Sequence, residues 1–284
     1  MRRQPGKLVP GVTVLGNLAL DVINGAPTSP GGCAAFCGVA LSAAGVEGRI
    51  VALAAQRDHA LFEPLLERFG SLVEILPADR TSAFRLDYDD LDHRRISVDA
   101  IGPVWGPAEI AAADPSTTWV HLAPLRTDFP AATLALLADR GHRLAYDGQG
   151  LVRADRTGPL IVDRYYPPEL LRHLSILKLA EDEAVIVADG EFTASTAARL
   201  GVPEILVTYG SEGCDIYTEG TVVRVPAAWR VEGVQTTGAG DMFTTAYVAN
   251  RAVGTAPGRS AAVASELVAR ELDRRRRVGS VGPA

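Results

Sequence analysis

Residues 235–241 place anion-binding groups directly before a group that can accept a proton. The run from 242 to 250 that follows has the apolar pattern of a helix. Backbone N–H groups at the start of a helix lack intrahelical partners, and the helix dipole favours negative charge there. Gly238 and Gly240 carry no Cβ, so an anion can approach the backbone closely. The segment therefore predicts an anion site.

Asp241 stands at the start of the same helix, where a carboxylate can serve a reaction at the anion. In phosphoryl transfer the protein mainly positions groups and stabilises charge, while one carboxylate orients or deprotonates the attacking hydroxyl. We therefore interpret Gly238, Ala239 and Gly240 as the cradle of a γ-phosphoryl group and Asp241 as the general base. The alternative interpretation is a helix-capping aspartate after a glycine-rich turn. The chain has no Walker A sequence, so a P-loop mechanism is not expected.

Strand-like and helix-like segments alternate along the chain and would position this turn. Strands are expected at 12–15, 49–53, 72–76, 119–122, 143–146, 176–179 and 205–208, and helices at 33–44, 60–69 and 131–139. Such alternation predicts an α/β fold with a mostly parallel sheet covered by helices on both faces. In sheets of this kind, ligands bind beyond the carboxyl ends of the strands.

Residues 81–99 interrupt the alternation with a hairpin pattern. Ala83, Arg85 and Asp87 alternate with apolar or aromatic residues, a second alternating run covers 95–98, and an Asp-rich turn containing His93 joins the two. One interpretation is an edge hairpin without function. The other is a small β lid that closes over a site and excludes water.

Composition excludes several functional classes. The 284 residues are 47% hydrophobic and 22% charged, and the net charge of -6 disfavours nucleic-acid binding. A basic run at 274–277 is interpreted as complementing a helix dipole or lying in solvent. The three cysteines, Cys33, Cys37 and Cys214, are too few and too poorly spaced for a disulfide framework or a zinc site. No apolar run is long enough to span a membrane, and the early residues suit a first strand better than a signal peptide, so a cytoplasmic protein is expected.

Residues 236–241 closely resemble the C-terminal signature of the ribokinase/PfkB carbohydrate kinases, and other segments agree with that family in order along the whole chain. The resemblance implies a three-layer α/β/α ribokinase-like fold with a β lid. It implies ATP and Mg²⁺ as cofactors, with a small molecule bearing a hydroxyl group as acceptor. It also raises the possibility of a homodimer formed through the lid.

The same resemblance implies roles for individual residues. The acceptor would be held by Asp21 and by the Gly31-Gly32 turn. Asp147 and Arg153 follow the strand expected at 143–146, so they too could face the acceptor, and Phe36 would line its site. The nucleotide would lie along the segment from Thr208 to Gly213, and the residues implied there are Thr208, Gly210, Ser211, Gly213 and Lys178. Glu183 would organise Mg²⁺. Each assignment has a structural alternative, namely a turn glycine, a cap, a surface ion pair or an exposed carboxylate.

Three positions depart from the family pattern. Gln235 replaces the usual Asp near the monovalent-cation site, so dependence on K⁺ is not expected. Ala180 replaces the usual Asn, which implies a Mg²⁺ network altered or completed by water. Phe36 replaces an Asn that binds the acceptor and offers an apolar wall instead. An aromatic residue at this position and the segment 147–153 resemble the inositol-kinase-like branch.

The sequence thus predicts one kinase domain at 11–278, with 79–102 as an inserted lid and with flexible tails at 1–10 and 279–284. We expect it to phosphorylate a hydroxyl of a sugar or cyclitol. A nucleoside kinase is the alternative within the fold, because Phe36 can stack on a base. A catalytically silent binding protein is the alternative outside the enzyme class, and it is motivated by Gln235 and Ala180.

Overall fold

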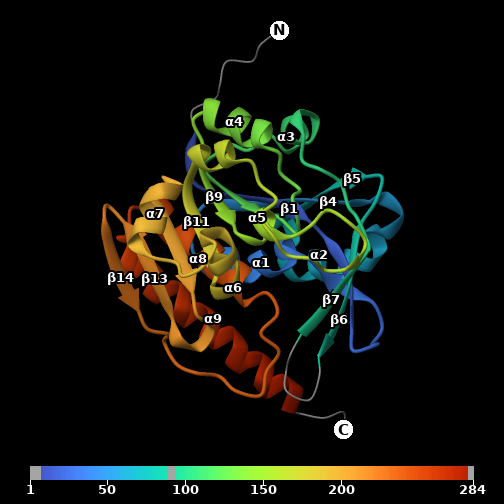
Figure 1. The fold of residues 1–284 in the computed structure, drawn as a ribbon. Helices are drawn as coiled ribbons and strands as arrows, with labels where there is room; N and C mark the ends of the chain where they lie inside the picture. Colours follow the sequence, from blue (N-terminus) through green and yellow to red (C-terminus); the bar gives the residue numbers. More distant parts are fainter. Residues whose placement is uncertain (1–7, 89–93, 281–284) are drawn as a thin grey trace.

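The computed structural model describes residues 8–88 and 94–280, and within them a nine-stranded sheet forms the centre of the molecule (Figure 1). Its order is β14-β13-β12-β11-β9-β8-β1-β4-β5. The neighbours from β5 to β12 all pair in parallel, and β13 and β14 complete one edge in antiparallel fashion. The strands are β1 (Val9–Asn17), β4 (Gly48–Ala55), β5 (Val73–Ala78), β8 (Thr117–Ala123), β9 (Arg143–Asp147), β11 (Leu174–Ala180), β12 (Glu204–Thr208), β13 (Cys214–Thr218) and β14 (Thr221–Val225).

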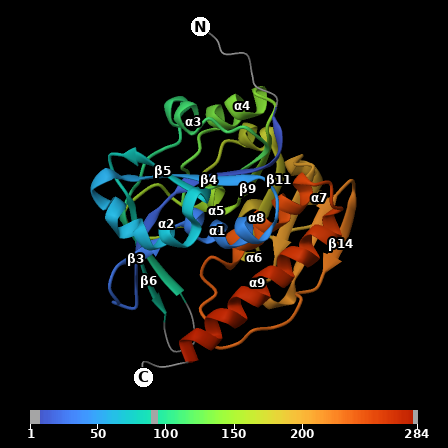
Figure 2. The same cartoon turned by 180° about the vertical axis from the view of Figure 1, so that it is seen from behind.

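Helices cover both faces of this sheet, which gives the expected three layers (Figures 1 and 2). One apolar core joins the sheet to α1 (Cys33–Ala43), α2 (Glu63–Phe69), α8 (Ala239–Ala252) and α9 (Pro257–Ser280). The other core joins it to α3 (Pro107–Ala113), α4 (Ala131–Asp139), α5 (Gln149–Val152), α6 (Glu181–Ala188) and α7 (Ala194–Leu200). Because the central strands are buried on both faces, their sequences are mostly apolar and do not alternate, as in β1, where residues 11–17 are all buried.

A second sheet forms the lid. Within the described part of the chain it has five strands in the order β10-β7-β6-β2-β3. They are β2 (Ala19–Ile23), β3 (Ser29–Gly31), β6 (Ser82–Tyr88), β7 (Arg94–Ala100) and β10 (Gly158–Pro159). The predicted hairpin corresponds to β6 and β7, but its 79–102 bounds are too narrow for the whole sheet. The three other strands have two to five residues, too few to show a reliable alternation in sequence.

The lid is joined to the main sheet through Asn17 at the end of β1. The Asn17 amide donates to the Pro103 carbonyl at 2.8 Å, and its side-chain oxygen accepts from the Trp105 indole N–H at 3.0 Å. Asn17 is fully buried, so water does not compete for these two hydrogen bonds. Asn17 therefore ties the point where the chain enters the lid to the segment that returns from β7.

Several predicted boundaries need correction. The helix expected at 60–69 begins at Glu63 after a 3₁₀ segment, since Pro64 suits the first turn of a helix. β1 begins at Val9 and α9 continues to Ser280, so regular structure reaches two residues beyond each end of the 11–278 range. The rest of the predicted tails and the turn containing His93 lie outside the described residues.

The basic run at 274–277 lies on α9, and its members are paired more extensively than expected. Arg274 bonds to Glu271 on the same helix, and Arg276 and Arg277 bond to Asp273. These three arginines are at the surface, whereas Arg275 extends away from α9 toward another part of the chain.

None of the helices in residues 8–88 and 94–280 combines the length and apolar character that crossing a membrane requires.

Candidate active site

The glycine-rich turn lies where the sequence predicted it, at the N-terminus of α8. Gly238 is the N-cap with a φ of 79°, a left-handed conformation that favours glycine. The Ala239 N–H donates to the Thr236 carbonyl at 2.9 Å, so it is used within the turn and is not directed at a ligand. The Gly240 N–H has no backbone acceptor among the described residues. Of the residues predicted to cradle an anion, Ala239 thus shapes the turn, and Gly240 has an amide that a ligand could use. Anion binding by residues 238–240 stays a prediction.

Phe36 of α1 supports this turn from below. A Cβ placed on Gly238 would overlap with the Phe36 ring, so ring and backbone are in direct contact. The aromatic residue that departs from the family pattern therefore has two roles here. It forms a wall of the smaller cavity described below, and its ring limits how closely the glycine-rich turn can approach α1.

Lys178 on β11 faces the same turn. Its side chain is 8% exposed, and a Cβ on Gly240 would lie 3.0 Å from the Lys178 ammonium. Burial acts to lower the pKa of Lys178, but the carboxylates of Glu183, Asp147 and Asp241 outweigh it and raise that pKa. The ammonium is therefore positively charged at the point where the first amides of α8 emerge.

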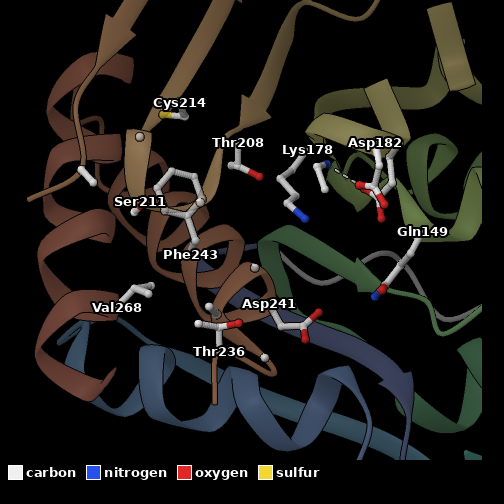
Figure 3. Close-up of a pocket in the computed structure, with 18 of the residues that line it drawn as sticks. Gln149, Lys178, Asp182, Thr208, Ser211, Cys214, Thr236, Asp241, Phe243 and Val268 are labelled. Carbon is white, nitrogen blue, oxygen red and sulfur yellow. Dashed lines mark hydrogen bonds between the residues drawn. The ribbon is translucent and has the colours of Figure 1, made fainter. Parts of the chain in front are cut away.

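Asp241 occupies the first turn of α8 and lines both cavities of the site. Figure 3 shows its carboxylate and the Lys178 ammonium directed into the same space. The Thr245 hydroxyl donates to the Asp241 carbonyl at 2.9 Å and so fixes the backbone that carries the carboxylate. An anion at Gly240 would thus lie between a fixed cation and a fixed carboxylate.

The larger cavity, about 800 Å³, extends from this point past the carboxyl ends of β11 and β12. All the residues implied for the nucleotide line it, namely Lys178, Thr208, Gly210, Ser211 and Gly213. Its far end is apolar and is formed by Val225, Ala227, Trp229, Val231, Phe243, Val268, Ala269 and Leu272. The lining of the cavity therefore combines polar groups, which carry charges of both signs, with an apolar part.

A smaller cavity of about 90 Å³ adjoins it beneath the lid. Its polar lining includes Asp21, Gln149, Arg153 and Asp241, and its walls include Phe36, Phe84, Leu86, Ile96 and Leu125. Gly32 also lines this cavity, whereas Gly31 does not. Gly31 has a different role, because a Cβ there would overlap with the Asp21 carboxylate.

Asp21 is a buried carboxylate that lines the smaller cavity. It is 6% exposed, and its Oδ1 atom has no hydrogen-bond partner among the described residues. Burial raises the pKa of Asp21 to about 6, and the opposing Arg153 guanidinium compensates only in part. A buried carboxylate without a partner is costly, so this oxygen is poised to accept a hydrogen bond from a ligand hydroxyl.

Asp147 does not line either cavity. It is 1% exposed and accepts from the His121 Nε2 atom at 2.9 Å and from the Thr244 hydroxyl at 2.7 Å. Burial acts to raise the pKa of Asp147, but His121 and the other partners lower it. His121 also contacts the Thr245 hydroxyl at 3.1 Å. This buried network supports the first turn of α8 from behind.

His121, Thr244 and Thr245 were not among the residues expected from the sequence. His121 lies within an apolar strand, and the two threonines lie within a helix, so no motif distinguishes them. Their spacing could have indicated a role, since Thr244 and Thr245 follow Gly240 and Asp241 by four residues. Threonine hydroxyls in helices can donate to the carbonyl four residues earlier, as these two do.

Glu183 fits a metal role only in part. One of its carboxylate oxygens accepts from the Ala180 N–H at 2.8 Å and caps α6. Among the described residues no group of three or more His, Cys, Asp or Glu side chains is arranged to hold a metal. Glu183 and Asp182 nevertheless line the polar end of the larger cavity. Such a set suits Mg²⁺, which is usually held by one or two carboxylates together with water and phosphate oxygens.

Comparison with known families identifies the family of the chain. The model of the pfkB family carbohydrate kinases matches residues 125–269, which is more than half of the chain. The chain belongs to this family. A comparison with curated proteins found no match. As a pfkB family carbohydrate kinase, the protein has the mainly parallel sheet and the β lid expected of the ribokinase-like fold.

Solved structures agree with this fold. A pyrophosphate-dependent kinase of the ribokinase family, complexed with a pyrophosphate analog and myo-inositol, is 20% identical with a TM-score of 0.78, and the match covers 95% of this chain and 100% of that chain. Ribokinase from Arabidopsis thaliana with ribose and ATP is 18% identical with a TM-score of 0.69, covering 94% and 93%. The Burkholderia thailandensis nucleoside kinase with inosine is 19% identical with a TM-score of 0.71, covering 92% and 90%.

The contact between Gly238 and Phe36 yields the first prediction. Gly238→Ala should lower kcat about 100-fold, because the methyl group collides with the Phe36 ring and displaces the turn by about an ångström. Gly254→Ala is the matched control, since Gly254 has a φ of 82° and a Cβ added there would have no other atom within 4 Å. Steady-state kinetics and thermal unfolding of both variants check this. Equal losses of activity in the two variants would contradict it.

The buried Asp21 carboxylate yields the second prediction, which concerns stability. A folded-state pKa of about 6, above the usual 3.8, means that the native state binds the proton more tightly than the unfolded state. Asp21 therefore costs stability above pH 6, and the cost disappears as the pH falls toward 4. Asp21→Asn should raise the free energy of unfolding at pH 7 by about 2 kcal/mol, with little difference at pH 4.

Urea denaturation at pH 4, 5, 6 and 7 measures this difference. Asp87→Asn on the exposed face of the same sheet is the control and should show no such pH-dependent gain. If Asp21→Asn is less stable than the natural protein at pH 7, Asp21 is not a strained carboxylate.

Proposed function

We propose that this pfkB family kinase transfers the γ-phosphoryl group of ATP to a hydroxyl group of a small sugar or cyclitol. The observation that carries the proposal is the meeting of two cavities at Asp241, one about 800 Å³ with an apolar end and the other about 90 Å³ with a poised carboxylate. The larger cavity suits a donor, and the smaller cavity suits an acceptor ring.

The apolar end of the larger cavity favours a nucleotide as donor. A pyrophosphate is charged throughout and would need only the polar end near Lys178 and Gly240. A nucleotide also carries an uncharged base, and apolar walls with a few polar groups are the usual environment of such a ring. Trp229 and Phe243 both line this end and offer aromatic surface to a base.

The smaller cavity favours a single ring as acceptor. Its walls are apolar, with Phe36, Phe84 and Leu86 facing the space where the carbon face of a ring would lie. Asp21 would accept from a hydroxyl of that ring, and Arg153 and Gln149 would complete its polar contacts. A nucleoside acceptor would need room for a base as well, so the small volume favours a sugar or a cyclitol over the nucleoside alternative.

The chain's own groups suffice for positioning and charge stabilisation. Lys178 and the first amides of α8 would stabilise the charge on the transferring phosphoryl group. Asp241 would accept the proton of the attacking hydroxyl as the new phosphate ester forms. Closure of the lid would exclude water, which otherwise competes with the acceptor. Mg²⁺, held near Glu183 and Asp182 with water and the donor's phosphates, would neutralise charge on the donor.

Pyrophosphate is the second candidate donor, because a structurally similar kinase is described as pyrophosphate-dependent. A catalytically silent protein is the remaining alternative and rests on Gln235 and Ala180. The geometry around Gly240, Lys178 and Asp241 supports catalysis. The three alternatives differ in which donors and acceptors give a product.

The third prediction tests the proposal with a matrix of donors and acceptors. ATP or pyrophosphate, with Mg²⁺, is offered with pentoses, hexoses, inositols and nucleosides, and phosphorylated products are identified by mass spectrometry. We expect turnover with ATP and one class of sugar or cyclitol. Asp241→Asn should lower kcat at least 100-fold, since a positioned base contributes about 10²–10⁴-fold.

Ala227→Trp separates the donors, because it fills the apolar end of the larger cavity. It should raise the KM for ATP without affecting turnover with pyrophosphate. If only pyrophosphate gives turnover, pyrophosphate is the donor and the proposal of ATP is wrong. No product with either donor, together with measurable ATP binding, would favour the silent binding protein.

A further inference from the structure

Thr237, which precedes the anion-binding turn, is held by two distant parts of the chain. The Arg275 guanidinium on α9 donates to the Thr237 carbonyl at 2.9 Å. The Tyr88 hydroxyl at the end of lid strand β6 lies 2.9 Å from the Thr237 hydroxyl. Figures 1 and 2 show α9 running toward the lid strands β6 and β7. Thr237 therefore connects the turn to both the C-terminal helix α9 and the lid.

Arg275 is itself firmly placed. Glu271, 7% exposed, accepts from the Arg275 Nε atom at 3.1 Å. The Arg275 guanidinium lies 5.8 Å from the centre of the Phe36 ring, and one of its nitrogens is 3.8 Å from the Met242 sulfur. Thus Arg275 contacts the residue before Gly238, the ring beneath Gly238 and the residue after Asp241.

We infer that Arg275 is a positioning residue for phosphoryl transfer, which holds the Thr237 carbonyl and thereby fixes the turn that carries Gly238, Gly240 and Asp241. The inference rests on the proposed function of that turn. Arg275 does not line either cavity, so it acts through Thr237 and Phe36 without touching a substrate.

The physical reason lies in the backbone before α8. Residues 226–238, which lead into the turn, form no helix or strand. The regular backbone hydrogen bonds of helices and sheets therefore do not fix the chain before the turn. A bond from a charged guanidinium to a carbonyl is stronger than a neutral one, and the planar group is fixed further by the Glu271 carboxylate. Displacing catalytic groups by about an ångström can lower a rate by about 10²-fold. Loosening the turn should therefore lower the rate of phosphoryl transfer more than it weakens the binding of donor and acceptor.

The neighbouring Arg274 provides a matched control. It bonds to the same Glu271 at 2.7 and 2.8 Å and lies on the same turn of α9. Its side chain is 53% exposed. Both arginines carry the same charge, but of the two only Arg275 bonds to Thr237. A difference between their variants therefore isolates the contact with the turn from general electrostatics and from helix stability.

The fourth prediction compares Arg275→Ala with Arg274→Ala. Arg275→Ala should lower kcat about 10- to 100-fold while the KM values for donor and acceptor change less than about threefold. Millimolar guanidinium, below denaturing concentration, should restore part of the lost kcat in Arg275→Ala and have no effect on Arg274→Ala. Kinetics and thermal unfolding are measured together, and Arg275→Lys replaces Arg275→Ala if the latter does not fold.

Hydrogen exchange gives a readout that does not depend on activity. The amides of Ala239 and Met242, which donate to the Thr236 and Gly238 carbonyls, should exchange at least about tenfold faster in Arg275→Ala than in Arg274→Ala. Equal exchange in the two variants would overturn the positioning role, as would equal kinetics or a loss that appears only in KM. If the natural protein shows no phosphoryl transfer, the proposed function fails, whereas the exchange experiment still decides whether Arg275 holds the turn.

Discussion

The architecture depends on placing positive charge at one point, where the Lys178 ammonium meets the N-terminus of α8. Both features favour an anion. Lys178 is buried, whereas residues 238–241 at the start of α8 are half-buried and line the larger cavity. Glu183, Asp147 and Asp241 surround the ammonium and raise its pKa, so the cation persists despite its burial. The parallel sheet makes this arrangement possible, since it delivers β11 and β12 with their carboxyl ends beside the start of α8.

Burying charged groups near this point costs free energy, and hydrogen bonds offset that cost to different extents at Asp147 and Asp21. Asp147 bonds to both His121 and Thr244, so the carboxylate behind the catalytic helix has partners of its own. Asp21 lacks a partner for one oxygen and remains strained until a ligand supplies a hydroxyl. The buried Asp21 thus lowers stability at the smaller cavity, whereas the bonded Asp147 does not lower it beneath the start of α8. Such a loss of stability is common where a site needs an unpaired polar group.

The sequence predicted the layers and the position of the glycine-rich turn because these depend on local patterns. Apolar runs indicated the central strands, and glycines before an apolar run indicated the start of α8. The five-stranded lid was predicted only in part, since short strands such as β10 form through partners distant in the chain. His121 and Arg275 carry no motif, and their roles arise only when β8, α8 and α9 are packed together. The hydrogen bond from the Ala239 amide to the Thr236 carbonyl could not be predicted, because it follows from the geometry of the turn.

The most direct test of the account is a crystal structure with ADP, Mg²⁺, aluminium fluoride and the acceptor identified by turnover. Aluminium fluoride stands in for the transferring phosphoryl group. We expect it to bind against the Gly240 amide and the Lys178 ammonium, with an acceptor hydroxyl within hydrogen-bond distance of Asp241. A fluoride bound away from the start of α8, or a hydroxyl directed to another carboxylate, would contradict the assignment of this turn and of Asp241 to catalysis.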